Sequence, residues 1–186
     1  MTKLQLKNSE IIVGVDFTNN LRVNEILTKE KNSFLLYPGK DNFNLSIRES
    51  SEINSFMGTN PHIFILDGTW PCARKMLKLS KNLQNLKRVS FDNKIKSKFI
   101  IKQQPNSLCL STIESVYTVL NLLKEGDLEQ CETKDFLIPF EKMIEHQLEY
   151  LLNPNSKNYS STAKKTIITK DMYKKSTERN IIFELE

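Results

Sequence analysis

The fold of this chain is decided by the stretch PHIFILDGTWPCARKM, residues 61–76. Residues 61–66 are almost wholly apolar, which predicts a buried strand that ends at an Asp-Gly pair. Thr69 is a favoured N-cap, and the proline that follows it falls in the first helical turn, where proline is tolerated. Apolar residues then recur at helical spacing to about Lys81. The stretch therefore predicts a strand, a tight turn and a helix.

The same patterns recur on both sides of this stretch. They predict further strands over 11–15, 33–37, 89–91 and 99–101, and helices over about 23–27, 111–126 and 135–152. Strands that are apolar throughout and alternate with helices indicate an α/β fold, with a mostly parallel sheet and helices on both faces. Ligands of such sheets bind beyond the carboxyl ends of the strands. Three loops are expected there: 37–39, 67–70 and the loop leading to Ser111.

Length and composition restrict the class of protein. A chain of 186 residues suits one α/β domain, and we expect a single domain over 1–152 followed by a polar, basic and partly disordered tail over 153–186. No apolar run approaches the ~20 residues that cross a bilayer, and the N-terminus lacks the apolar segment of a secretory signal. We therefore expect a cytoplasmic protein with no membrane association and no obligatory protein partner. Three scattered cysteines and two histidines predict no metal site.

Positive charge is concentrated in one segment. The net charge is +5, and residues 74–102 hold ten basic side chains against a single acid, Asp92. Such a segment favours a polyanionic partner such as nucleic acid. A solvated, lysine-rich helix face is an equally good interpretation on charge alone, because charge gives affinity without identity.

The Asp-Gly-Thr-Trp turn, residues 67–70, has two interpretations. A glycine after a strand lets a ligand approach the backbone, and the helix that follows offers free N–H groups. The Asp67 carboxylate would then lie at the mouth of a site, beside the Trp70 indole, which can stack on a base or on adenine. Alternatively, this is an ordinary strand-to-helix turn, with Asp67 accepting nearby amides and Trp70 in the core.

Three segments, in order, resemble the motifs of one family. Residues 65–76, ILDGTWPCARKM, resemble the signature of the DTW-domain proteins, which are named for the residues matched here by Asp67, Thr69 and Trp70. LLYPG at 35–39 resembles the upstream strand-end motif of that family, and LSTIES at 110–115 resembles its downstream motif. The family is similar to the SPOUT-like aminocarboxypropyltransferases. The resemblance implies a SPOUT-like sheet whose C-terminal part forms a trefoil knot.

The resemblance also implies the reaction. S-adenosylmethionine would donate its 3-amino-3-carboxypropyl group to N3 of a uridine in tRNA, releasing methylthioadenosine. Asp67 and Trp70 are the expected catalytic residues; an ordinary aspartate is a weak base for an imide, so either partial burial strengthens Asp67 or it only orients the reactants. The expected cofactor-binding residues are Leu36, Tyr37, Pro38, Leu66, Asp67, Gly68, Thr69, Leu110, Ser111 and Thr112. Glu114 completes an S-x-x-E capping box, so we interpret it as mainly structural.

Basic residues after Trp70 are expected to bind the RNA backbone. Arg74, Lys75, Lys78 and Lys81 follow one another at a spacing that can place them on one helix face, and Lys102 is assigned to the same role. Together with Lys87, Arg88, Lys94, Lys96 and Lys98 they would form a phosphate-binding rim.

The chain also departs from the family pattern. Family members usually begin with a cysteine-containing segment, which this sequence does not show before Leu4, so we expect an N-terminally shortened member. Related sequences often have arginine at the position of Lys102. Lysine keeps the positive charge there but cannot form the bidentate hydrogen bonds of a guanidinium. Two alternatives stay open: a SPOUT-like RNA methyltransferase, and an RNA-binding remnant without catalytic activity.

Overall fold

The computed structural model describes residues 1–39, 41–93, 96–101, 109–153 and 155. These residues fall into two compact units. The sheet unit comprises residues 2–92 and 118–131, and the helical unit comprises the described residues of 93–117 and 132–155. The expectation of a single domain over 1–152 stays a prediction, and most of the expected tail lies outside the described residues.

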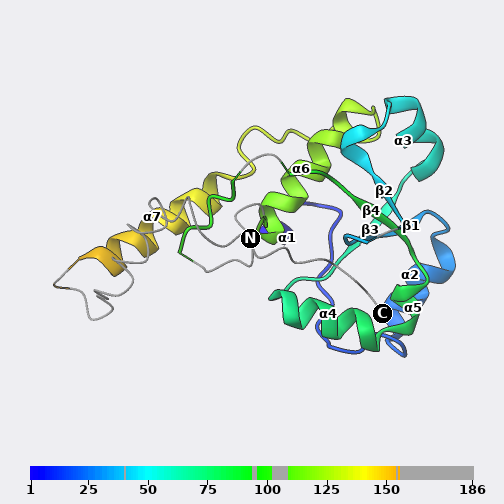
Figure 1. Ribbon diagram of the computed structural model, residues 1–186, viewed down its shortest axis with the longest axis horizontal. Coiled ribbons are helices and arrows are strands. Elements are labelled where there is room, and N and C mark those ends of the chain that lie inside the picture. Colours follow the sequence, from blue (N-terminus) through cyan, green and yellow to red (C-terminus); the bar gives the residue numbers. More distant parts are fainter. Residues whose placement is uncertain (40, 94–95, 102–108, 154, 156–186) are drawn as a thin grey trace. The chain divides into compact units, whose positions relative to one another are not determined.

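A four-stranded parallel sheet organises the sheet unit (Figure 1). Its strands are β1 (Ser33–Leu36), β2 (Asn42–Asn44), β3 (His62–Ile65) and β4 (Lys87–Ser90), in the order β2-β4-β1-β3. All three pairings are parallel, and Leu36 lies opposite Ile65 of β3 and Val89 of β4. The strands expected over 33–37, 61–66 and 89–91 are therefore confirmed, as is the α/β class with a parallel sheet.

Helices connect the strands and complete both units. They are α1 (Thr2–Gln5), α2 (Leu21–Lys29), η1 (Leu45–Ile47), α3 (Ser50–Met57), α4 (Trp70–Leu79), α5 (Lys81–Gln84), α6 (Thr112–Glu125) and α7 (Ile138–Leu152). The first half of α6 belongs to the helical unit and the second half to the sheet unit. No helix among the described residues is both long and apolar enough to span a membrane.

Two hydrophobic clusters cover the two faces of the sheet. On one face, Leu35 and Tyr37 pack with residues of α2, α4 and α5; on the other, Phe34 and Val89 pack with residues of α3 and the second half of α6. Alternate residues of a strand point to opposite faces, so neighbouring positions of β1 serve different clusters. We call these the α4 face and the α3 face. Helices on both faces of the sheet are thereby confirmed.

The expected strand over 11–15 was wrong. This segment has no ladder pairing among the described residues, and Val13 is 91% exposed. Ile12 alone packs against the cluster on the α4 face. A β-branched run becomes a strand only when it finds a partner, so propensity is overruled by tertiary structure here. The strand expected over 99–101 was also wrong, because these residues form a turn in the helical unit.

The helix after Thr69 is shorter than expected. It ends at Leu79, and Lys81 starts the separate helix α5. Between them Ser80 is fully buried, and its hydroxyl accepts the Phe17 N–H at 2.9 Å. The Lys81 N–H in turn donates to the Thr18 hydroxyl at 3.1 Å. These bonds divert the backbone from a continuous helix.

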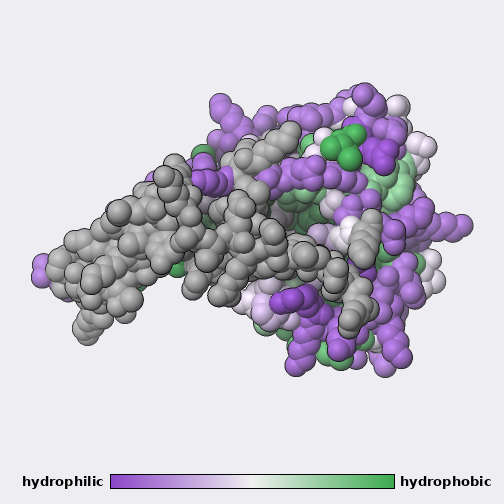
Figure 2. All heavy atoms as spheres, viewed as in Figure 1, coloured by the Kyte–Doolittle hydropathy of each residue, from purple (hydrophilic) through white to green (hydrophobic). Residues whose placement is uncertain are grey.

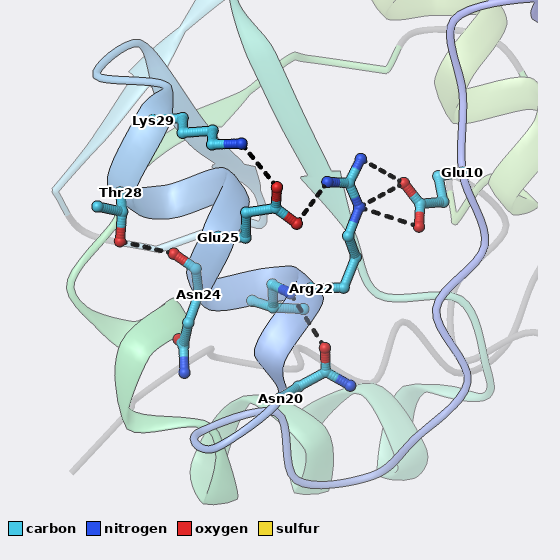
Figure 3. A network of polar contacts seen from close by, with 8 residues as sticks. Glu10, Asn20, Arg22, Asn24, Glu25, Thr28 and Lys29 are labelled. Atoms are coloured by element: carbon cyan, nitrogen blue, oxygen red, sulfur yellow. Dashed lines mark hydrogen bonds and ion pairs between the residues drawn. The ribbon is translucent and has the colours of Figure 1, made fainter.

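A polar network joins α2 to the segment before it (Figure 3). Arg22 forms ion pairs with Glu10 at 3.0 Å and Glu25 at 2.9 Å, and Lys29 pairs with Glu25 at 2.7 Å. The hydrogen bond from Lys29, and then that from Arg22, lowers the pKa of the Glu25 carboxyl. The side chains are largely exposed, so the network fixes geometry more than it stabilises the fold. Figure 2 shows mostly hydrophilic residues on the visible described surface.

Candidate functional site

The loops after β1 and β3 meet at the carboxyl edge of the sheet. Leu36 and Ile65 are the last residues of their strands and lie opposite each other, so Tyr37 and Leu66 begin neighbouring loops. In an open parallel sheet this edge is where ligands bind. The structure therefore brings together the first two of the three expected ligand loops.

Thr69 caps the amino end of α4. Its hydroxyl accepts the backbone N–H of Cys72 at 3.4 Å, and a proline occupies the first turn, as the sequence predicts. Gly68 is tightly placed, because a Cβ there would lie 3.3 Å from the Cys72 Cβ and 3.4 Å from the Met76 methyl. A larger residue at position 68 would therefore press on the first turns of the helix.

Tyr37 and Trp70 form the aromatic part of this edge. Tyr37 is only 5% exposed, and its N–H donates to the Val89 carbonyl at 3.1 Å. Its ring meets the half-buried Trp70 ring edge-on, with centroids 6.4 Å apart and planes at 65°. Burial raises the pKa of the Tyr37 hydroxyl, and the charges of Arg74 and Arg88 offset part of that rise. The hydroxyl is therefore a neutral donor at physiological pH.

Asp67 lies one residue beyond Leu66 and is exposed. Asp67 also has an interaction of its own within the protein. Asp67 therefore follows β3 at the carboxyl edge of the sheet without the partial burial that was considered for it, and its catalytic role stays a prediction. Pro38 and Leu66 are half-buried on the same edge.

The third expected loop belongs to the helical unit. Leu110, Ser111 and Thr112 are half-buried at the start of α6. The convergence of this loop with the other two stays a prediction.

The Glu114 carboxylate accepts hydrogen bonds from residues at and near the start of α6. It is 6% exposed, and its carboxylate accepts the Ser111 N–H at 2.8 Å, the Ser111 hydroxyl at 2.6 Å and the Ser97 hydroxyl at 2.7 Å. The backbone N–H of Lys98 donates to its second oxygen at 2.7 Å. The Ser-x-x-Glu spacing predicted the contact with Ser111, whereas nothing in the sequence pointed to Ser97 and Lys98.

The expected RNA-binding residues are divided among different elements. Arg74, Lys75 and Lys78 are exposed on α4, whereas Lys81 is exposed on α5, so the expected single helix does not carry all four. Lys102 lies outside the described residues.

The wider phosphate-binding rim is also divided. Lys87 lies over the Phe56 ring on the α3 face, 5.3 Å from its centroid, and Arg88 lies over the Tyr37 ring on the α4 face, 5.8 Å from its centroid. Lys98 pairs with Glu141 in the helical unit. Sequence reasoning therefore grouped Lys87 and Arg88, which lie on opposite faces of the sheet.

No group of three His, Cys, Asp or Glu side chains within the described residues is placed to hold a metal ion. The expected absence of a metal stays a prediction. Side chains suited to an organic ligand are present instead: an aromatic pair, an acid, two guanidinium groups and a helix amino end, all on or beside one sheet edge.

Comparison with known proteins finds a matching domain family and several similar proteins. The DTW domain matches residues 1–148. Proteins named tRNA-uridine aminocarboxypropyltransferase 2 are similar: that of Macaca fascicularis is 26% identical over 126 residues, and that of Drosophila melanogaster 31% over 119 residues. These alignments cover 66% and 63% of this chain, but 39% and 43% of the relatives. No solved structure matches significantly.

The chain thus spans about two fifths of the curated relatives it matches. The DTW match, by contrast, includes both strand-end loops and the start of α6. This protein belongs to the DTW-domain family.

Proposed function

We propose that this protein is a tRNA-uridine aminocarboxypropyltransferase that uses S-adenosylmethionine as donor. The observation that carries the proposal is the Tyr37–Trp70 aromatic pair beside the exposed Asp67 at the carboxyl edge of a parallel sheet, within a DTW domain. The names of the relatives support the class of reaction. We further propose a SPOUT-like arrangement with a C-terminal knot, and a cytoplasmic protein, on the resemblance and composition given above.

The proposed reaction forms one bond and breaks one. N3 of uridine attacks the γ-carbon of the aminocarboxypropyl chain, the carbon–sulfur bond breaks, and its electron pair neutralises the sulfonium to give methylthioadenosine. The N3 proton must leave, and Asp67 accepts it through water or orients the nucleophile. The sulfonium is already a good leaving group, so the protein contributes mainly orientation.

The remaining residues would divide between donor and RNA. Leu36, Tyr37, Pro38, Leu66, Gly68, Thr69, Leu110, Ser111 and Thr112 would hold S-adenosylmethionine, and Trp70 would stack on the uridine or on adenine. The exposed cations of α4 and α5 would contact tRNA phosphates, together with Lys102.

The experiment is a transfer assay with a matched control. The protein is incubated with S-adenosylmethionine labelled in the aminocarboxypropyl chain and with tRNA lacking the modification, and the digested nucleosides are analysed by mass spectrometry. Labelled aminocarboxypropyl-uridine is the expected product. We expect Asp67→Asn to slow its formation by about 10²-fold to 10⁴-fold, the usual contribution of general base catalysis.

Asp127 provides the control. It is also exposed, and it lies in the turn after α6 with a φ of 57°, which asparagine tolerates. Asp127→Asn should leave the rate unchanged. A methylated uridine with release of S-adenosylhomocysteine would instead favour the methyltransferase alternative. Failure to bind S-adenosylmethionine would overturn the enzyme proposal.

A further inference from the structure

Arg88 is held against the loop that follows β1. Its guanidinium carbon lies 5.8 Å from the centre of the Tyr37 ring. A Cβ built on Gly39 would come within 2.8 Å of the Arg88 Nη1 atom. Glycine at position 39 therefore makes room for the guanidinium beside the carboxyl edge of the sheet.

The sheet register explains why Arg88 reaches this place. Arg88 lies opposite Leu35 of β1, and Tyr37 is two residues further along the same strand direction, so all three belong to the α4 face. Val89 packs on the α3 face, where Lys87 also points. Arg88 is thus separated by the sheet from Lys87 and is half-buried next to an aromatic ring.

A second guanidinium acts on the same tyrosine. Arg74 of α4 and Arg88 both lower the pKa of Tyr37, although burial has the larger effect. Within the described part of the chain, neither arginine forms an ion pair with a carboxylate. Arg88 is therefore a half-buried positive charge beside the Tyr37 ring, and no carboxylate of the described residues forms an ion pair with it.

We propose that Arg88, held beside Tyr37 and Gly39, binds the carboxylate of the aminocarboxypropyl chain of S-adenosylmethionine. This proposal rests on the proposed function, because it places the carboxylate end of S-adenosylmethionine at the carboxyl edge of the sheet, where the candidate site lies. A planar guanidinium matches a carboxylate with two parallel hydrogen bonds. A half-buried arginine beside a buried tyrosine suits a small ligand better than an RNA backbone, which is met by protruding cations such as Lys75 and Lys78.

The binding mode has a consequence for which group is transferred. A sulfonium carries three substituents, and an enzyme chooses among them by orientation. Anchoring the carboxylate fixes the far end of the aminocarboxypropyl chain and thereby restricts the direction of its γ-carbon. Arg88 is therefore a determinant of both donor affinity and the choice of the transferred group.

The test compares two donors that differ in the carboxylate. Binding of S-adenosylmethionine and of decarboxylated S-adenosylmethionine is measured by calorimetry for the unsubstituted protein and for Arg88→Ala. We expect Arg88→Ala to weaken S-adenosylmethionine binding by about 10-fold to 100-fold, as for the loss of hydrogen bonds to a charged group. Binding of the decarboxylated compound should not weaken, because it has no carboxylate to lose.

Two further variants test whether the position of the Arg88 side chain matters, beyond the positive charge of an arginine. Gly39→Ala keeps both arginines but displaces the end of the flexible Arg88 side chain, so it should weaken S-adenosylmethionine binding selectively in the same way. Arg48→Ala is the matched control: Arg48 also lies over an aromatic ring, 5.3 Å from the centroid of Phe43, at the start of the α3 region. It should leave binding of both compounds unchanged.

Other outcomes contradict the proposal in distinguishable ways. Equal loss of both compounds in Arg88→Ala, with a normal circular dichroism spectrum, would make Arg88 a structural residue. Unchanged S-adenosylmethionine binding with weakened tRNA binding in a filter assay would assign Arg88 to an RNA phosphate and overturn the carboxylate site. If the unsubstituted protein binds neither compound, the proposed function itself fails.

Discussion

The acid next to the start of α4 and the acid at the start of α6 differ in their burial. At α4, Asp67 is exposed two residues before the N-cap Thr69, beside the aromatic pair of Tyr37 and Trp70. At α6, Glu114 is buried and its two oxygens accept four hydrogen bonds from Ser97, Lys98 and Ser111. Both acids lie in short polar motifs at a helix start. Burial distinguishes an acid that is committed to the fold from one that lies at the surface.

The largest expected effect on stability follows from this difference. Glu114→Ala leaves part-buried donors of Ser111, Ser97 and Lys98 without their acceptor, and we expect the free energy of unfolding to fall by about 3 kcal/mol. Asp67→Ala should lower it by less than about 1 kcal/mol, because Asp67 is exposed. Urea unfolding followed by circular dichroism measures both. Similar losses in the two variants would show that the two acids contribute equally to the stability of the fold.

A smaller loss is expected for the cap of α4. Thr69→Ala removes the acceptor of the Cys72 N–H, and caps of this kind contribute about 1 kcal/mol. The bond is long at 3.4 Å, so the loss should lie at or below that value. Thr69→Ser keeps the hydroxyl and should retain most of the stability in the same urea titration. A loss as large as that of Glu114→Ala would show that Thr69 has a further role in the fold.

The smallest effect concerns pH at the aromatic edge. Burial raises the pKa of Tyr37 above that of the unfolded chain, so the folded state holds the phenolic proton more tightly. The contribution of the Tyr37 hydroxyl to the free energy of unfolding is fully present below about pH 10. It is lost as the pH rises through the pKa of the folded state. Absorbance at the phenolate band should show one late-ionising tyrosine that disappears in Tyr37→Phe. An unchanged titration curve in that variant would contradict the burial of the hydroxyl.

Much of the fold was predictable because its central elements have unambiguous patterns. The apolar runs at 33–37 and 61–66 became β1 and β3, and the stripe that includes Val116 and Val119 became α6. β2 and α3 were missed, since residues 42–57 are largely polar and their contribution to the core depends on a few side chains such as Met57. Periodicity identifies elements that bury a whole face and fails for those that bury one or two residues.

The candidate site was predictable to the extent that it is local in sequence. The turn at 67–70 and the Tyr37 loop are each read from one strand end, and the structure joins them through the β1–β3 register. Arg88 was assigned to a phosphate rim because its charge can be read from the sequence, whereas the face of the sheet on which it lies cannot. The face depends on its register with Leu35, a pairing between distant segments that no local pattern contains.

The strand order also has a consequence for synthesis on the ribosome. β1 is an interior strand, yet it is the first strand made, and its neighbour β4 is the last of the four strands among the described residues. One edge of β1 therefore stays without its partner until residue 90 has left the exit tunnel, which takes several seconds at about 5–20 residues per second. During that interval the sequence Phe34-Leu35-Leu36 is an open apolar strand. The nascent chain should need a chaperone most between the emergence of β1 from the exit tunnel and that of β4.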